Sequence, residues 1–515
     1  MIPKLDEEIR REARKLICRH QRYATEVHDE LNRIERRSGV RPLKVLRSPE
    51  HWKRSPGFDP YHVFYNAPAI AHAISNALRR RTYEPKPPVD YAVPREGSSP
   101  RTVSIFQIAD NTVSRVFFKR LLAKNASRMS SRCYAYRTDI TLHDAILDIH
   151  SSFRDKSRIF IAEFDFSKYF DSIRHDHIKR VIKDRRFHIT DREHDVIWAF
   201  LRAKAEAAIS TEPRSAGVPQ GTSLSLFLAN VAAYPLDRKL EGMGVDFARY
   251  ADDTLIWSDS YPRLCDAVAA LEEAARTMGV ELNLKKSEGI NLLTGHEARA
   301  EISQKRAVSF LGYSLSTNTI SIKPDAVERI KQHISKLIYR NLVEEPKRGR
   351  IVPARFEPHI DRDYVVLMFQ LRRYMYGNLA ESTLRRYLAS ASPRIHYRGL
   401  MSFYPIVNDD RTLRHLDGWL VHTIFTSIAL RRKLLESAGF HDLPQPHGLP
   451  KRALISFHGR TRAGEKLDLR IPSFLRISKL LRKASALHGP NAIASTQAGL
   501  HYAGWASVPL GRGYY

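Results

Sequence analysis

The stretch FARYADDTLIW, residues 247–257, places two adjacent aspartates between two short apolar runs. The segments on either side, DFAR and TLIW, are β-prone, so residues 250–253 are expected at the tip of a β-hairpin. Like charges held this close repel, and each carboxyl tends to stay protonated unless a cation neutralises the pair. A hard divalent metal ion would neutralise Asp252 and Asp253 in this way.

A second Asp-Asp pair shows that the dipeptide alone is weak support for a metal site. Asp409 and Asp410, in VNDDRT, lack the apolar flanks and are expected in a solvated turn. Further carboxylates are needed before a metal site can be predicted.

The segment RIFIAEFDFSKYFDSI, residues 158–173, supplies a third carboxylate. A strand over residues 159–164 would deliver Asp165 at its end, because a carboxylate inside the sheet would be desolvated without a partner. Asp171 is expected to cap the helix beginning near His175 or to make a local hydrogen bond, and a catalytic role is the less favoured alternative. Three carboxylates on two adjacent strands can bind two magnesium ions, one to activate a 3′-hydroxyl and one to hold triphosphate oxygens.

Composition indicates a globular, multidomain protein with a polyanionic partner. The chain has 515 residues and is 43% hydrophobic, which predicts two to four domains. Lys and Arg number 84 against 56 Asp and Glu, so the net charge is +28. Because this excess is spread along the whole chain, an extended polyanion fits better than the alternative of a merely soluble basic protein.

Cysteine usage and the N-terminus predict a cytoplasmic protein. Cys18, Cys133 and Cys265 are too scattered for a disulfide framework or a paired zinc site. The opening segment MIPKLDEEIRREARKL is too charged for a signal peptide. No apolar run approaches membrane-spanning length, so no membrane association is expected.

Hydrophobic periodicity divides the chain into helical ends and a mixed middle. A helical stripe over residues 5–38 stops at Gly39 and Pro42, and is expected to pack against the body of the protein. Residues 100–315 alternate strands and helices. Further helices are expected near 66–81, 324–341, 363–390 and 411–437. A Pro/Gly linker at 442–452 precedes a short basic module and a tail ending in GRGYY.

Taken in order and spacing, these segments resemble the successive palm motifs of reverse transcriptases. The motifs are FDFSKYFDSI at 164–173, SAGVPQGTSLSLFLANVAAYPLD at 215–237, RYADD at 249–253, GVELNLKKSEG at 279–289 and VSFLGYSL at 308–315. Upstream, RTVSIFQIADNTVSRVFFKRLL at 101–122 and CYAYR at 133–137 resemble finger segments of bacterial reverse transcriptases of the group II intron and retron kind.

The resemblance implies an α+β, right-hand polymerase with fingers, palm and thumb and with helical N- and C-terminal extensions. The expected boundaries are an N-terminal helical extension at 1–80, fingers at 81–150, palm at 151–315, helical thumb at 316–440 and a C-terminal basic extension at 441–515.

The resemblance also assigns roles around the acidic residues. Asp165, Asp252 and Asp253 match the family's metal-binding aspartates, and the backbone carbonyl of Phe166 is an expected further ligand of the two Mg²⁺ ions. Phe170 stands where these enzymes place the aromatic residue beneath the sugar. Its bulk would clash with a ribose 2′-hydroxyl, so deoxynucleotides are the expected substrate.

Further residues are expected to hold the incoming nucleotide. Gln220 in PQG matches the residue lining the nucleotide pocket, and Gly221 leaves room for a close backbone approach. Arg95 and Arg101, on either side of EGSSP, match the paired basic finger residues that clamp a triphosphate. Leu226 stands where the commoner family pattern has proline, which puts the start of that helix in question.

Other positions keep two interpretations. Lys286, with Lys285 as its rival, matches a lysine that protonates or stabilises the leaving pyrophosphate. Tyr250 supports the primer end or fills the core, and Arg137 contacts template or makes structural hydrogen bonds. The VSFLGYSL segment should form a hairpin that grips the primer, with Gly312 at the bend.

The chain most resembles stand-alone bacterial reverse transcriptases associated with phage defence. It lacks the Cys/His cluster of a zinc-linked nuclease, and it keeps Gln220, which diversity-generating enzymes typically replace. The expected function is RNA-directed DNA synthesis from dNTPs on a structured non-coding RNA, giving a DNA product. A retron-type enzyme and a non-polymerising, maturase-like RNA-binding protein are the alternatives. Oligomerisation stays open, as does priming on RNA, on DNA or on Tyr514 or Tyr515.

Overall fold

The chain forms two compact units. The computed structural model describes residues 4–43, 46, 48–95, 98–154, 156–185, 187–204, 214–283, 287, 289–295, 302–357, 359–377, 380–389, 399–460 and 464–490. The first unit comprises residues 1–24 and 46–306, and the second comprises 25–45 and 307–515. Helix α1 (Leu5–Ser38) contributes to both units and confirms the helix predicted at 5–38. Leu5, Ile9 and Ala13 on its apolar stripe are buried, as packing against the body requires.

The first unit is a mixed sheet with helices on both faces. Its helices after α1 are α2 (Pro60–Arg80), α3 (Ile108–Asn125), α4 (Leu142–Phe153), α5 (Tyr169–Ser172), α6 (His175–Asp184), α7 (Asp191–Arg202), α8 (Ser223–Gly242) and α9 (Tyr261–Met278). Its strands are β1 (Val89–Arg95), β2 (Ser98–Ile105), β3 (Arg158–Ser167), β4 (Asp246–Tyr250), β5 (Asp253–Ser258), β6 (Glu281–Leu282), β7 (Ile290–Thr294) and β8 (Gln304–Lys305).

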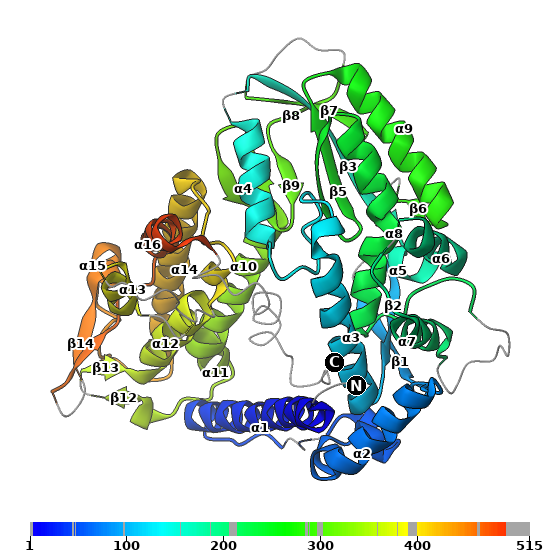
Figure 1. Ribbon diagram of the computed structural model, residues 1–515. Coiled ribbons are helices and arrows are strands. Elements are labelled where there is room, and N and C mark those ends of the chain that lie inside the picture. Colours follow the sequence, from blue (N-terminus) through cyan, green and yellow to red (C-terminus); the bar gives the residue numbers. More distant parts are fainter. Residues whose placement is uncertain are drawn as a thin grey trace. The chain divides into compact units, whose positions relative to one another are not determined.

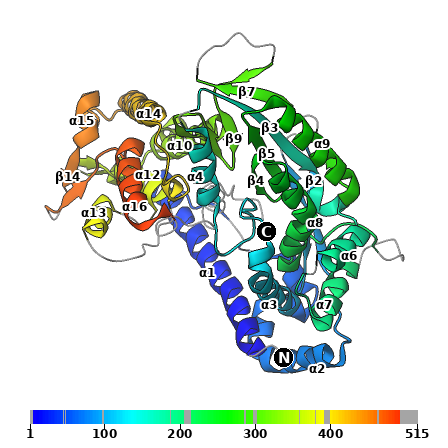
Figure 2. The same cartoon turned by 45° about the horizontal axis from the view of Figure 1, so that its top comes forward.

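The large sheet has the order β4-β5-β3-β7-β8, with β6 paired to the end of β3 (Figure 1). Side chains alternate between its faces along each strand. Phe160, Ala162 and Phe164 join a core with α8 and α9 on one face. On the other face, Trp257 of β5 packs edge-on against Phe153 of α4, with ring centroids 5.5 Å apart. Figures 1 and 2 show α9 and α4 on opposite sides of this sheet.

The second unit is mainly helical. Its helices after α1 are α10 (Pro324–Ile338), α11 (Glu344–Lys347), α12 (Arg362–Tyr376), α13 (Glu381–Leu388), α14 (Asp410–Ser437), α15 (Lys451–Ser456) and α16 (Phe474–His488). Its strands are β9 (Val308–Phe310), β10 (Tyr313–Leu315), β11 (Ile320–Ile322), β12 (Phe356–Glu357), β13 (Ile360–Asp361), β14 (His458–Arg460) and β15 (Lys466–Asp468). Strands β9 and β10 pair around Leu311 and Gly312, both at positive φ, which confirms the predicted bend at Gly312.

Three predicted helix boundaries differ from the structure for local reasons. The helix predicted at 66–81 begins at Pro60, because the Asp59 carboxylate caps its first turn. The helix predicted at 363–390 divides into α12 and α13, because Gly377, at a φ of 60°, ends α12. The helix predicted at 324–341 leaves the α form after Ile338 and continues as a π turn over Tyr339–Val343.

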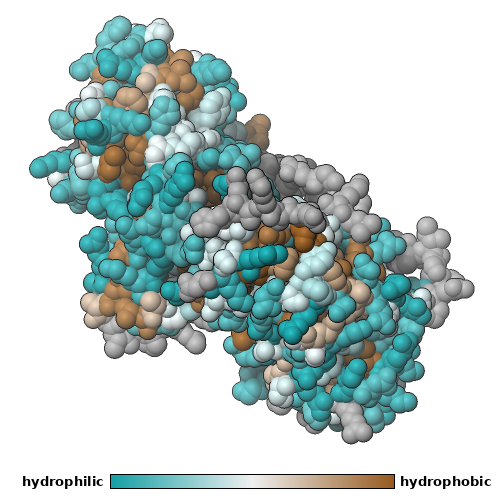
Figure 3. Space-filling view, turned by 90° about the horizontal axis from the view of Figure 1, so that it is seen from above, coloured by the Kyte–Doolittle hydropathy of each residue, from teal (hydrophilic) through white to brown (hydrophobic). Residues whose placement is uncertain are grey.

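No helix in the described ranges is both long enough and apolar enough to cross a bilayer. The face in Figure 3 agrees with this, because hydrophilic residues dominate it and hydrophobic residues form small separate patches. The terminal tyrosines, Tyr514 and Tyr515, lie outside the described residues, as does the whole tail from 491 onward.

A buried ion-pair network holds the second unit together. Arg431 of α14 is only 2% exposed, and its Nε donates to Asp361 Oδ2 at 2.7 Å while its Nη2 donates to Asp363 Oδ2 at 2.8 Å. Its Nη1 donates to the Leu342 carbonyl at 3.0 Å. Burial alone would raise the pKa of Asp361, but the charges and hydrogen bonds of Arg431 and His447 together outweigh burial and lower that pKa. The network joins α14 to the start of α12 and to the π turn.

We expect Arg431→Met to lower the free energy of unfolding by about 3–5 kcal/mol, because two buried carboxylates would lose their main cation. The adjacent Arg432 provides a matched control. It is exposed, and among the described residues it pairs only with Glu436 four residues on, so Arg432→Met should cost less than about 1 kcal/mol. Urea denaturation of both variants measures the difference, and equal losses would contradict the role given to the network.

Candidate active site

The three predicted metal-binding aspartates meet at one end of the large sheet. In the antiparallel ladder of β3 and β5, Asp165 lies directly opposite Asp253. In the hairpin of β4 and β5, Tyr250 pairs with Asp253, so Ala251 and Asp252 form the two-residue turn between them. This register confirms the predicted hairpin and explains how acids far apart in the sequence become neighbours.

Asp165 differs from expectation in one respect, because it does not lie at the end of its strand. Strand β3 continues to Ser167, and Phe166 pairs with Leu282 of β6. Asp165 instead lies at the last pair with β5, where that neighbouring strand begins. Its side chain is half-buried, and Oδ2 accepts a hydrogen bond from Asn283 Nδ2 at 2.9 Å. A polar partner from the β6 end therefore makes an acid tolerable inside the sheet.

The turn that carries Asp252 is held by Arg249, which is fully buried. Its Nε and Nη2 donate to the two carboxylate oxygens of Asp237, each at 2.6 Å. Its Nη1 donates to the Ala251 carbonyl at 3.2 Å, and Nη2 also lies 3.1 Å from Cys133 Sγ. Burial alone would lower the pKa of Arg249, but the charge and hydrogen bonds of Asp237, together with Cys133 and Tyr169, outweigh burial and raise that pKa. The guanidinium therefore stays charged, and it donates a hydrogen bond directly to the backbone of the turn.

This support matters because the turn backbone is strained. Ala251 has a φ of 59°, in the left-handed region that residues with a Cβ seldom adopt. Such conformations cost on the order of 1–3 kcal/mol and persist only where the surroundings determine them. The hydrogen bond from Arg249 supplies that constraint one residue before Asp252.

The expected finger segment CYAYR, residues 133–137, and the residue before it hydrogen-bond to strand β4 beside the acids. The Tyr134 amide donates to the Arg249 carbonyl, and the Arg249 amide donates to the Arg132 carbonyl, both at 2.9 Å. Asn230 of α8 donates from Nδ2 to the Ala135 carbonyl at 2.8 Å. Two segments distant in the sequence, residues 132–135 and α8, therefore converge on the strand that leads to the aspartates.

An aromatic cluster lies beside the acids. Phe170, which is 9% exposed, meets Tyr136 edge-on with ring centroids 6.4 Å apart. Tyr136 also contacts Tyr250 at 6.2 Å between centroids. Burial, and then the charge of Asp252, raise the pKa of Tyr136. Phe170 is thus held in place, with a small edge exposed.

Gln220 links the β2 strand to the segment after β3. Its Oε1 accepts a hydrogen bond from Arg101 Nε, and its Nε2 donates to Asp171 Oδ1 at 2.7 Å. The Ser104 amide donates to the Gln220 carbonyl at 2.7 Å. A Cβ on Gly221 would lie 2.2 Å from the Ser104 carbonyl oxygen, so only glycine fits there. This confirms the expected close backbone approach at Gly221.

Asp171 and Leu226 clarify two alternatives. The Asp171 carboxylate bonds to Gln220, a tertiary partner, and Arg174 is the N-cap residue of α6, so the predicted capping role of Asp171 is wrong. Leu226 lies inside α8, whose start is capped by Thr222 Oγ1 accepting from the Ser225 amide. The helix therefore begins without the proline that the commoner family pattern has.

The structure does not describe some of the predicted residues, and it favours a structural interpretation of another. Lys285 and Lys286 lie outside the described residues, as does the side chain of Arg95, whose backbone belongs to β1. Arg137 donates to the Ser130 carbonyl at 2.7 Å and pairs with Asp139, which favours its structural interpretation.

The donor set suits magnesium, although no closed cage is present. Within the described ranges, no group of three or more His, Cys, Asp or Glu side chains is arranged to hold a metal ion. Magnesium is usually held by one or two carboxylates together with substrate phosphates and water, so a cage made by the protein alone is not required. The cross-strand pair Asp165 and Asp253, with Asp252 beside it, fits that mode of binding.

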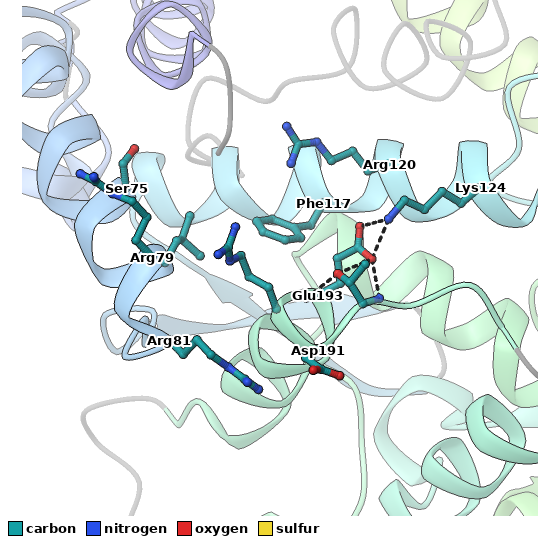
Figure 4. Close-up of a pocket in the computed structure, with 11 residues that line it drawn as sticks. Ser75, Arg79, Arg81, Phe117, Arg120, Lys124, Asp191 and Glu193 are labelled. Atoms are coloured by element: carbon teal, nitrogen blue, oxygen red, sulfur yellow. Dashed lines mark hydrogen bonds and ion pairs between the residues drawn. The ribbon is translucent and has the colours of Figure 1, made fainter.

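A separate cavity of about 780 Å³ lies in the first unit between α2, α3 and the start of α7 (Figure 4). Several cations line it, but local carboxylates compensate two of them. Lys124 Nζ lies 2.7 Å from the nearer carboxylate oxygen of Glu193, and Arg81 pairs with Asp195. None of the predicted site residues lines this cavity.

Sequence reasoning missed the residues that support the acids, although these residues lie within or beside the recognised motifs. Arg249 lies directly before the YADD motif, and Asp237 closes the motif that contains Gln220. Asn283 lies in the motif GVELNLKKSEG, which also contains Lys285 and Lys286. Their roles depend on pairings between distant segments, which no local pattern predicts.

Comparison with known proteins places this site in a recognisable domain. Residues 93–315 match the family model described as reverse transcriptase (RNA-dependent DNA polymerase). The retrovirus-related Pol polyprotein from type-1 retrotransposable element R2 of Popillia japonica is 26% identical over 225 residues, covering 39% of this chain and 31% of that protein. The chain therefore spans about a third of the length of this curated relative.

Solved structures with a similar arrangement include telomerases. Apo telomerase from Candida tropicalis, truncated from the C-terminal domain, gives a TM-score of 0.34 at 12% identity, covering 50% of this chain and 60% of that one. Telomerase from Candida tropicalis with a TWJ fragment of telomeric RNA gives 0.36 at 12%, covering 87% and 68%. The family match identifies residues 93–315 as a reverse transcriptase domain, and this match, together with the mixed helices and strands of the first unit, confirms the expected α+β right-hand polymerase fold.

We expect Arg249→Lys to impair nucleotide incorporation by loosening the Asp252 turn, because lysine cannot contact Asp237 and the Ala251 carbonyl with one rigid fork. The Mg²⁺ concentration for half-maximal incorporation should rise severalfold at a temperature where the variant stays folded. Purely structural damage would lower the active fraction without moving that midpoint. Arg132→Lys alters a part-exposed pair with Asp246 at the far end of β4 and should leave the midpoint unchanged.

Proposed function

We propose that this protein is an RNA-directed DNA polymerase that extends a primer with dNTPs by two-metal phosphoryl transfer. The observation that carries the proposal is the register of the sheet, which sets Asp165 opposite Asp253 and Asp252 at the adjoining turn. This arrangement lies within the residues that match the reverse transcriptase model.

The three aspartates would hold two Mg²⁺ ions through their carboxylate oxygens, with the carbonyl of Phe166 as a further ligand. When bound, the ions supply positive charge that favours ionisation of the primer 3′-hydroxyl and neutralises the triphosphate. Gln220, fixed between Arg101 and Asp171, would present one edge of the nucleotide pocket. Positioning and charge neutralisation are the main contributions that a protein makes to phosphoryl transfer.

Arg101 and Arg95 would contribute positive charge toward the triphosphate from the hairpin of β1 and β2, in which Val93 pairs with Arg101. Arg101 bonds to Gln220 through Nε, so the guanidinium keeps its terminal nitrogens for phosphate oxygens. Lys286 would act on the leaving pyrophosphate, as the resemblance implies.

Phe170 would select deoxynucleotides. Its ring packs edge-on against Tyr136 and Tyr169, and its backbone is held by the Val218 amide, which donates to the Phe170 carbonyl at 2.7 Å. An immobilised ring excludes a 2′-hydroxyl better than a mobile one, because it cannot move aside to admit the extra oxygen.

The template would be a dedicated, structured non-coding RNA, and the role would be anti-phage defence in the cytoplasm. The net charge of +28 supports a large nucleic-acid partner, and the motif pattern supports the defence assignment. Sequencing the RNA and DNA that co-purify with the protein tests the template assignment. A single abundant RNA with complementary DNA is the expected result, and random cellular RNA without complementary DNA would contradict it.

We expect Asp252→Asn with Asp253→Asn to abolish Mg²⁺-dependent dNTP incorporation, since neutral amides bind magnesium poorly. The melting temperature and RNA affinity should stay close to those of the unchanged protein, because Asp253 is exposed and Asp252 only half-buried.

The chain's other Asp-Asp pair provides the control for this double variant. Asp409 caps α14 and Asp410 pairs with Arg482, so neither belongs to the first unit. Because asparagine is also a good N-cap, Asp409→Asn with Asp410→Asn should keep incorporation. Full activity in the Asp252 and Asp253 variant would overturn the assignment of these residues.

We expect Phe170→Ala to raise the use of rNTPs relative to dNTPs by about tenfold or more, the scale on which a pocket discriminates by sterics. The ratio of kcat/KM values for the two substrates is the measurement, because loss of folded protein affects both equally. Phe170→Tyr keeps the bulk of the ring and should keep the ratio. An unchanged ratio in the alanine variant would place sugar selection elsewhere.

A further inference from the structure

A basic groove of about 480 Å³ runs between α13 and α16 in the second unit. We call this surface the basic groove. It is lined by five cations, with Leu480 and Ala486 between them. The five cations are Arg385 of α13 and Arg476, Lys479, Arg482 and Lys483 of α16. No Asp or Glu side chain lines the groove among the residues that the structure describes.

The periodicity of α16 places these cations on its outer side. Phe474, Ile477 and Leu481 face the core and are fully buried. Arg476, Lys479 and Lys483 recur at intervals of three and four residues on the opposite side, so they form a stripe along the helix. At 1.5 Å per residue, this stripe is about 10 Å long.

Nearby carboxylates compensate only part of this charge. Arg482 Nη2 lies 2.6 Å from Asp410 Oδ1, and Lys479 Nζ lies 3.9 Å from Oδ2 of the same aspartate. Arg476 lies 3.8 Å from Glu381. Within the described part of the chain, Arg385 and Lys483 have no ion-pair partner. Two carboxylates therefore face five cations, and the groove keeps an excess of positive charge.

The cavity between α2, α3 and α7 is another basic concavity, but its positive charge is better compensated. Its lining includes Asp191 and Glu193 as well as its cations, and Lys124 donates to both oxygens of Glu193, at 2.7 and 2.9 Å. Figure 4 shows Lys124 reaching this carboxylate. Charges that are already paired would have to be separated before phosphates could bind, whereas Arg385 and Lys483 need no such exchange.

We propose that the basic groove binds the phosphodiester backbone of RNA and anchors it to the second unit. The inference rests on the proposed function for its choice of RNA, and on the groove's own charge for its choice of phosphates. Arginine and lysine contacts to phosphates release counterions and carry no sequence preference. Leu480 and Ala486 provide apolar contact for sugars between the cations. The groove lies outside residues 93–315, which match the reverse transcriptase model.

Arg385→Ala with Lys483→Ala tests the proposal without breaking an ion pair among the described residues. The probe is a labelled RNA hairpin of arbitrary sequence, bound to the full chain over a range of KCl concentrations. Each phosphate contact contributes about 1 to the slope of log affinity against log salt. The slope measured for the double variant should therefore be smaller by about 2. As a result, a fourfold increase in KCl should weaken RNA binding by the double variant about sixteenfold less than RNA binding by the unchanged protein.

Two further variants control for net charge and for folding. Lys451→Ala with Arg452→Ala removes the same charge from exposed positions on α15 and should leave the slope unchanged. Arg385→Lys with Lys483→Arg keeps the charge in the groove and should keep most of the affinity. Circular dichroism melting curves confirm that all variants are folded at the assay temperature.

The outcomes separate this inference from the proposed function. Nucleotide incorporation on a short primer-template should be unchanged in the Arg385→Ala, Lys483→Ala variant. If the unchanged protein itself is inactive in this assay, the proposed function is rejected, but the RNA-binding result still stands. If the double variant shows the same slope as the unchanged protein, the groove does not bind RNA phosphates and the proposal is rejected. A loss confined to duplex DNA, or to vesicles containing phosphatidylserine, would also overturn it, because RNA would then not be the ligand.

Discussion

The buried ion pair between Arg249 and Asp237 is the interaction on which the acidic site depends. Both side chains are almost completely removed from water, with exposed fractions of 0% and 1%. Such a pair is stable only when its remaining donors are also satisfied, because desolvation costs several kcal/mol per ion. Here those donors reach the Ala251 carbonyl, Asn230 and Cys133. The charge that stabilises the core thereby also fixes the strained turn before Asp252.

Much of this arrangement follows from local sequence patterns. The apolar flanks of the Asp-Asp pair predict the β4–β5 hairpin, and Gly312 predicts the bend of the next one. The two hairpins are predictable because turn geometry and strand alternation depend on residues only a few positions apart. The solvated turn expected at Asp409 and Asp410 is wrong, because Asp409 caps α14 and Asp410 begins that helix.

Other features depend on contacts between distant segments and could not be predicted. Gln220 bonds to Arg101 and Asp171, which lie 119 and 49 residues away. The ladder of β3 with β6 carries the strand past Asp165, although the apolar run ends before it. Which acid caps a helix and which bonds across the fold is decided by tertiary packing, because the competing hydrogen bonds have similar energies.

Net charge predicts the class of partner but not its position. Salt screens charges over about 8 Å at physiological ionic strength, so distant cations raise the rate of encounter with RNA but do not fix where it lies. Position depends on cations that carboxylates leave uncompensated. Around α7, Glu193 and Asp195 each take up a cation, whereas along α16 Asp410 is shared by Lys479 and Arg482. Because one carboxylate is shared by two cations, an excess of positive charge remains on this surface. A phosphate backbone is the ligand that such a surface attracts most strongly.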